Sequence, residues 1–188
     1  MAQAKSLTQN EIDQILRYIS TKKLGYRDRV MFLMTVWSGM RIKEVAALRI
    51  CDVVNEDGTI KAEVRLSAEQ TKGKHSRTVF LPEKLRREVA HYIKSKSLKF
   101  PELPLFYSAS GRAFNANTLC QNFYWMYRAA GVSGASSHSG RRTFITSLAG
   151  KGIGVRVLAS LAGHRSISIT QRYIDVNDDM KRAAVELV

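Results

Sequence analysis

The spacing of hydrophobic residues changes along this chain, and the change limits the possible folds more than any other feature of the sequence. In residues 12–19 they recur every three or four positions, which is the period of a helix with one face turned inward. In residues 60–66 they alternate with charged residues, which is the period of a half-buried strand. The chain must therefore combine helices with a sheet.

The neighbouring segments extend this pattern. Thr8 and Glu11 have the spacing of a capping box and predict the start of the first helix. Residues 29–37 are apolar almost all round, which predicts a fully buried helix that ends at Gly39. Residues 77–81 predict the returning strand of a hairpin with a basic tip. Further helices are expected over residues 41–48, 82–93, 117–130, 141–149, 155–161 and 178–187.

This order of elements predicts the fold class. We expect a mostly α domain with a small antiparallel β-sheet of about three strands, an α+β arrangement. Strands and helices do not alternate, so a Rossmann-type fold is disfavoured. A chain of 188 residues is long enough for one well-buried domain, and we expect a single domain over residues 1–188.

The charge balance indicates the class of partner. Thirty Lys and Arg residues against sixteen Asp and Glu residues give a net charge of +14. Such an excess predicts a polyanionic partner, which is DNA, RNA or an anionic membrane surface. No apolar run approaches the roughly 20 residues of a membrane span, and the N-terminus lacks the apolar core of a signal peptide. The two cysteines, Cys51 and Cys120, lack metal-ligand spacing; we expect free thiols in a reducing cytoplasm and no metal or cofactor.

Two clusters in the first half carry side chains suited to an anion. Arg41 follows a glycine at a predicted helix start, where backbone N–H groups also favour negative charge. Its alternative interpretation is a surface ion pair with Glu44, one turn later. Lys72 lies in the basic hairpin tip, where a lysine can reach a phosphate, and Lys74 competes with it. The alternative there is a solvated charged turn.

Two clusters in the second half have the same character. His138 and Arg141 lie three residues apart at a loop-to-helix junction, where both side chains can point at one anion. His164 precedes Tyr173 by nine residues. A tyrosine hydroxyl is a poor nucleophile unless cations, hydrogen-bond donors or a base surround it. Taken alone, each cluster can equally be a structural histidine, a helix start or a packed tyrosine.

Taken together, the clusters are much more specific. In this order they resemble the catalytic domain of the tyrosine recombinases, the phage integrase family, from about Leu7 to the C-terminus. The chain departs from the family pattern at Gly140, where leucine is usual, and at Arg142, where a second histidine is usual. The residues that match the family's catalytic set are Arg41, Lys72, His138, Arg141, His164 and Tyr173, and Glu44 matches its acidic residue.

The resemblance implies a site-specific recombinase that cleaves and rejoins DNA through a covalent 3′-phosphotyrosine. It implies that the two arginines clamp the phosphate oxygens, the histidines add donors and the lysine protonates the leaving 5′-oxygen. It also implies that His138 takes the tyrosine proton and that Glu44 orients its neighbours. Six further cations are expected to contact DNA: Lys43, Lys74, Arg77, Arg142, Arg165 and Arg172.

The resemblance also bears on partners and domain organisation. We expect double-stranded DNA and a homotetramer on paired sites, with no membrane partner. Typical members carry an N-terminal DNA-binding domain, and we expect it to be absent here. A helix within residues 177–188 either docks on a neighbouring subunit or packs on its own domain. The functional alternatives are a type IB topoisomerase, a non-catalytic accessory protein of the same fold, and a plain basic nucleic-acid-binding module.

Overall fold

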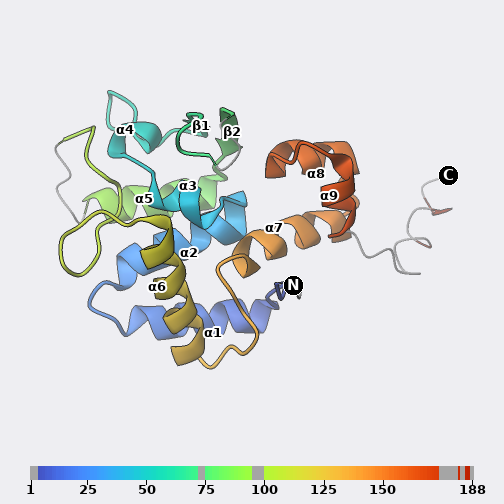
Figure 1. The fold of residues 1–188 in the computed structure, drawn as a ribbon, viewed down its shortest axis with the longest axis horizontal. Coiled ribbons are helices and arrows are strands. Elements are labelled where there is room, and N and C mark those ends of the chain that lie inside the picture. The colour runs from blue at the N-terminus through green and yellow to red at the C-terminus, as the bar shows by residue number, and fades with distance from the viewer. Residues whose placement is uncertain (1–3, 72–74, 95–99, 174–181, 183–184, 187–188) are drawn as a thin grey trace.

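The fold is that of a computed structural model, which describes residues 4–71, 75–94, 100–173, 182 and 185–186. Helices dominate, and a small hairpin lies on one side of them (Figure 1). The elements in chain order are α1 (Gln9–Ser20), α2 (Gly25–Ser38), α3 (Ile42–Ala46), α4 (Ile50–Val53), β1 (Glu63–Leu66), β2 (Arg77–Phe80), α5 (Glu83–Lys94), α6 (Ala116–Ala129), α7 (Ser139–Gly150), α8 (Val155–Ala162) and α9 (Ile167–Gln171).

Capping residues mark the start of α1 and the end of α2. The Thr8 hydroxyl accepts from the Glu11 N–H, and the Glu11 carboxylate accepts from the Thr8 N–H, so the predicted capping box is present. α2 is buried along most of its length, as its apolar sequence predicts. It ends at Gly39 in the left-handed conformation, with φ of 66°. No helix in the described ranges is long and apolar enough to cross a membrane.

The sheet is smaller than the sequence predicts. β1 and β2 pair antiparallel, with Glu63 opposite Phe80, and the described part of the chain holds these two strands only. The expected third strand is absent from the described residues, and the strand predicted over residues 60–66 is shorter than expected, because β1 begins at Glu63. Ile60 forms an isolated bridge to Val54, and the Lys61 N–H donates to the Val53 carbonyl, so this segment closes a loop on α4. The predicted fold class, mostly α with a small antiparallel sheet, is confirmed.

Two predicted features fall on parts of the chain outside the described residues. The hairpin tip that carries Lys72 and Lys74 is one of them. The predicted helix within residues 177–188 is the other, apart from residues 182 and 185–186.

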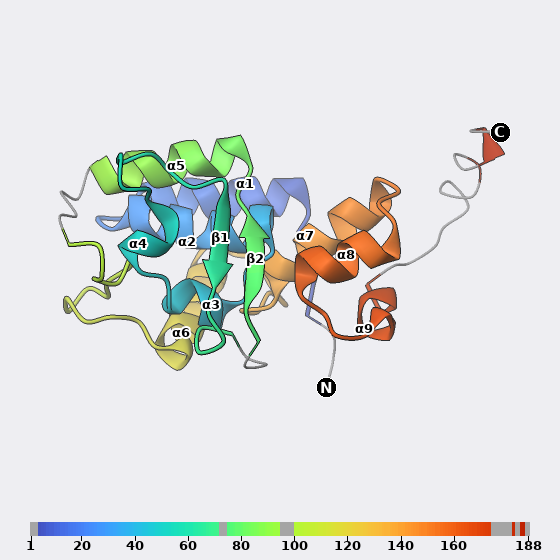
Figure 2. The same cartoon turned by 90° about the horizontal axis from the view of Figure 1, so that it is seen from above.

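The hydrophobic core divides the molecule into two unequal parts. One contiguous cluster joins buried side chains from α1 to α6 and the hairpin. α7 packs along α2 and carries the chain to the opposite end of the molecule, where α8 and α9 lie (Figures 1 and 2). The buried apolar side chains Ile145, Leu158 and Ala162 of α7 and α8 are not part of the main cluster. α8 packs against α7 and α9, and it touches the larger body at β2.

The seating of α7 on α2 depends on Gly140. A β-carbon at Gly140 would lie 2.0 Å from Thr35 Oγ1 and 2.8 Å from Thr35 Cβ. Thr35 cannot give way easily, because it is fully buried and its hydroxyl donates to the Phe32 carbonyl at 2.7 Å. The leucine that is usual at this position in the family it resembles would therefore not fit here without a shift of Thr35.

This contact gives a prediction with an internal control. Gly140→Ala should lower the free energy of unfolding by about 1–3 kcal/mol, the usual cost of overpacking a core. Gly150→Ala, at the other end of the same helix, meets nothing within 4 Å. It should raise the free energy of unfolding by about 0.4–1 kcal/mol, because alanine restricts the unfolded chain. Urea unfolding of both variants tests this, and equal effects would contradict the close approach.

Candidate active site

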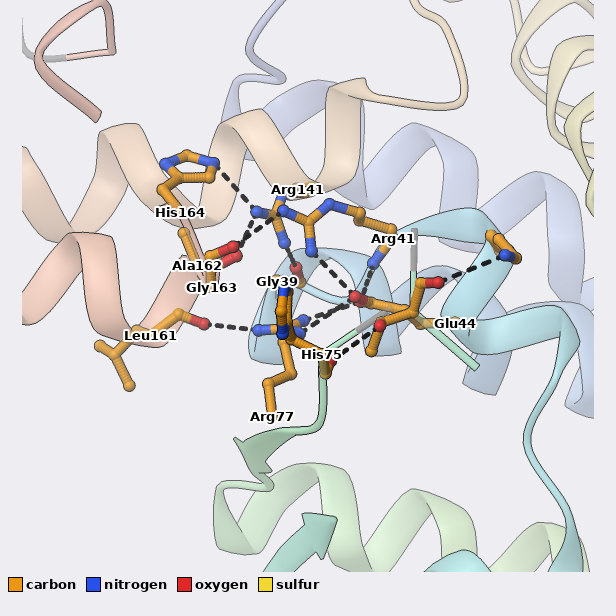
Figure 3. Close-up of polar contacts among 12 residues, drawn as sticks. Gly39, Arg41, Glu44, His75, Arg77, Arg141, Leu161, Ala162, Gly163 and His164 are labelled. Carbon is orange, nitrogen blue, oxygen red and sulfur yellow. Dashed lines mark hydrogen bonds and ion pairs between the residues drawn. The ribbon is translucent and has the colours of Figure 1, made fainter. Parts of the chain in front are cut away.

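The site is built around the C-terminal end of α8. The last carbonyl groups of a helix have no partner within the helix and must be satisfied from outside. Here three guanidinium groups from distant segments donate to three successive carbonyls (Figure 3). Leu161 O accepts from Arg77 Nη1 at 2.8 Å, Ala162 O accepts from Arg141 Nη2, and Gly163 O accepts from Arg41 Nη2 at 3.2 Å.

Glu44 joins two of these arginines. Its carboxylate is fully buried and pairs with Arg41 Nη1 at 2.9 Å and with Arg77 Nη2 at 2.7 Å. Burial alone would raise the pKa of Glu44, but the hydrogen bonds and charges of the arginines outweigh it and lower that pKa. The carboxylate also accepts the Arg41 N–H at 2.7 Å. The backbone N–H of Arg41 was expected to face an outside anion, but it already donates to Glu44.

Arg141 is the most enclosed cation of the site. Only 6% of the residue is exposed, and Nη1 donates to the Gly39 carbonyl at 2.6 Å. Burial, together with the charges of Arg41 and Arg77, lowers the pKa of Arg141 to about 9. It stays charged at neutral pH, and three of its five N–H groups are used within the described part of the protein.

His164 is held by a partner on each ring nitrogen. Nε2 lies 3.0 Å from Arg141 Nη2, which can only donate, so Nε2 accepts. Nδ1 then carries the proton and donates to Thr170 Oγ1 at 2.9 Å. Burial and the neighbouring arginines lower the pKa of His164 to about 4. The sequence did not predict a role for Thr170. The one available signal was that it belongs to a run of small and hydroxyl residues after the histidine.

Tyr173 lies just beyond α9, beside His164. Their rings stack, with centroids 5.8 Å apart and 24° between the planes. The Arg142 guanidinium lies over the tyrosine ring, 5.2 Å from its centroid. The phenol ring thus contacts both an imidazole and a cation. Arg142, which is expected to contact DNA, contacts this ring in the structure.

Two adjacent hollows open at these residues, and they share Arg41 and His164. The first, of about 460 Å³, brings together most of the predicted catalytic residues. Its lining includes Arg41, His138, Arg141, Arg142, His164, Arg172 and Tyr173. The second, of about 490 Å³, is lined by Arg77 and Arg165, and by Thr71 and His75, which flank the undescribed residues 72–74. The predicted lysine itself lies outside the described residues.

Two of the expected DNA-contacting cations, Lys43 and Arg77, donate hydrogen bonds to other parts of the protein. Lys43 is exposed on α3, and its ammonium donates to the Thr71 carbonyl at 3.3 Å. Arg77 is turned inward: Nε and Nη2 bind Glu44, Nη1 binds Leu161 O, and its side chain is 10% exposed. The structure therefore favours an internal role for Arg77 in place of the expected DNA contact. Across the described residues, no three His, Cys, Asp or Glu side chains are grouped as metal ligands.

The state of His164 gives a pH prediction for the free protein. Its folded pKa lies near 4, below the ordinary value of 6.5. The unfolded state therefore binds the proton first, so the free energy of unfolding should decrease as pH falls from about 6.5 towards 4. Nitrogen-15 NMR should show the Nδ1–H tautomer and a titration midpoint near 4. Thr170→Val should disturb the tautomer, and a wild-type midpoint near 6.5 would contradict this geometry.

Comparison with known proteins places this geometry in a family. A XerA tyrosine recombinase of Pyrococcus furiosus is 30% identical over 187 residues, which are 97% of this chain and 61% of that protein. A XerC tyrosine recombinase of Pelobacter propionicus is 28% identical over 174 residues, 90% of this chain and 55% of that protein. The chain thus spans roughly three fifths of the length of the curated relatives it matches.

Solved structures show the same fold. A XerA recombinase crystal structure superposes on the whole chain with a TM-score of 0.78 at 22% identity and is covered to 66%. The catalytic domain of bacteriophage HP1 integrase superposes on 98% of the chain with a TM-score of 0.68 at 20% identity, and 95% of that domain is covered. The phage integrase family model matches residues 5–180. The chain belongs to the phage integrase family.

Proposed function

We propose that this protein is a site-specific DNA recombinase of the tyrosine type, which cleaves and rejoins DNA strands through a covalent 3′-phosphotyrosine. One observation carries the proposal: Arg41, Arg141, His164 and Tyr173, from segments far apart in the sequence, line one hollow. Family membership and the named recombinases among the relatives support it. A structure of the Tn1549 transposon integrase with transposon end DNA, with a TM-score of 0.75, supports DNA as the substrate.

The attack begins at Tyr173. Its hydroxyl oxygen forms a bond to phosphorus, and the phenolic proton passes to His138, which lines the same hollow. The bond from phosphorus to the 5′-oxygen breaks, and the leaving oxygen takes a proton from Lys72. That lysine follows Thr71, a residue that lines the adjacent hollow. The 3′-phosphate remains on the tyrosine. Because the phosphotyrosine bond conserves the energy of the broken bond, a 5′-hydroxyl can reverse the step without a cofactor.

The arginines supply the electrostatic part of this reaction. The transition state spreads negative charge over the non-bridging oxygens, and preorganised donors stabilise it without reorganising. Arg41 and Arg141 are fixed before DNA arrives, since each already donates to a carbonyl at the end of α8 or nearby. Contacts within the described residues use two N–H groups of Arg41 and three of Arg141, so each guanidinium keeps N–H groups for a phosphate.

The surrounding cations suit a duplex. Arg142, Arg165 and Arg172 line the two hollows, and the whole chain carries a net charge of +14. Such cations neutralise backbone phosphates and release counterions, which drives binding without regard to sequence. Exchange between two duplexes requires four strand cleavages, so we propose that four copies act together on paired sites. The proposed recombinase would then act on DNA in the cytoplasm.

Substitution of the nucleophile tests the function directly. Tyr173→Phe should give no covalent protein–DNA adduct on a nicked suicide substrate, while DNA affinity should be unchanged, because the ring and its stacking remain. The matched control is Tyr124→Phe, which removes an exposed hydroxyl on α6 that bonds Arg128. This variant should form the adduct like the wild type.

The outcomes separate the alternatives. An adduct of normal yield with Tyr173→Phe would reject Tyr173 as the nucleophile. A wild-type protein that binds DNA and forms no adduct would be an accessory protein of this fold. Adducts together with relaxation of any supercoiled plasmid, without a specific site, would favour a type IB topoisomerase.

A further inference from the structure

All three nitrogen atoms of the Arg77 guanidinium bond groups of the protein. Its guanidinium forms a two-pronged pair with Glu44, with Nε–Oε1 at 3.0 Å and Nη2–Oε2 at 2.7 Å. Its third nitrogen donates to Leu161 O at 2.8 Å. A planar guanidinium fits this arrangement and a lysine ammonium does not, because the ammonium is a point charge. The side chain thus spans the distance from strand β2 to α3 and to the end of α8 (Figure 3).

Gly163 leaves room for the Arg77 side chain because it has no β-carbon. It has φ of 60°, which favours glycine, and a β-carbon there would lie 2.7 Å from Arg77 Cδ. The residue after this glycine is His164. The arginine therefore packs against the turn that aims the histidine at the first hollow.

The contact between Arg77 and Leu161 O joins α8 to the larger body of the protein. The apolar side chains of α8 lie outside the main core cluster, and β2 is the element of that larger body that α8 contacts most. Arg77 is the first residue of β2 and bonds α8 directly. Loss of its guanidinium would leave Leu161 O without this donor and the buried Glu44 without one of its two cations.

We infer that Arg77 is a positioning residue for the proposed reaction: it fixes Glu44 and the end of α8, and so sets where Arg41 and His164 stand. This rests on the proposed function for its effect on cleavage, and on the structure alone for its effect on α8. It differs from a DNA contact in a measurable way. A cation that neutralises a phosphate contributes about 0.9 to the slope of log affinity against log salt, whereas a positioning residue contributes nothing.

The test uses Arg77→Lys, which keeps the positive charge and removes the bidentate pair with Glu44. Cleavage of a suicide substrate at saturating DNA should fall on the order of 10²-fold, the cost of a small misplacement of reacting groups. The salt slope of DNA binding is compared in Arg77→Gln, which removes the charge as well, and it should be unchanged. Hydrogen exchange of the free protein should be faster at the amides of Gly163 and His164, which donate to Ser160 and Ala159 at the end of α8.

The matched control is Arg29→Lys. In the wild type, Arg29 forms a similar bidentate ion pair that joins α2 to Glu88 of α5, with N–O distances of 2.8 and 2.6 Å. The Arg29→Lys variant should lose stability without losing cleavage rate or changing exchange at α8. Wild-type cleavage or unchanged exchange at α8 with Arg77→Lys would overturn the inference, as would a smaller salt slope with Arg77→Gln. If the wild type itself forms no adduct, the proposed function fails, and the exchange measurement still decides the role of Arg77.

Discussion

The carbonyl end of α8 is held by guanidinium groups from three segments of the chain, and the geometry of the site depends on this contact. Arg41 comes from the start of α3, Arg77 from β2 and Arg141 from α7. A helix end that is rich in unpaired carbonyls carries partial negative charge, so it attracts cations. α8 lies outside the main hydrophobic cluster, and these polar contacts join its end to α3, β2 and α7.

The same contact prepares the arginines for a phosphate. Three guanidinium groups close together repel one another, and the pKa values of Arg141 and His164 are lowered by burial first and then by the charges of the neighbouring arginines. Glu44 offsets part of it from a fully buried position. A phosphate would supply the remaining negative charge. The hollow is therefore electrostatically suited to an anion before the anion arrives, which is the condition for preorganised stabilisation of a charged transition state.

The sequence predicted what depends on local spacing and on the joint motif. The capping box at Thr8, the buried helix before Gly39 and the His164–Tyr173 neighbourhood are visible in short windows. The role of Arg77 is not, since its partners lie 33 and 84 residues away and a basic residue at a strand start resembles a DNA contact. The sequence also did not show that the strand expected over residues 60–66 begins only at Glu63, because the competing bridge between Ile60 and Val54 depends on how the loop after α4 closes. Thr170 joins the site only through the fold of α9.

The most direct test of this account is the chemical identity of the protein–DNA linkage. The protein would be trapped on a suicide substrate, digested with protease and nuclease, and the linked peptide sequenced by mass spectrometry. The account predicts a phosphodiester between the Tyr173 oxygen and the 3′ end of the cleaved strand, with a free 5′-hydroxyl on the other fragment. Linkage through another residue, or to a 5′ end, would contradict it.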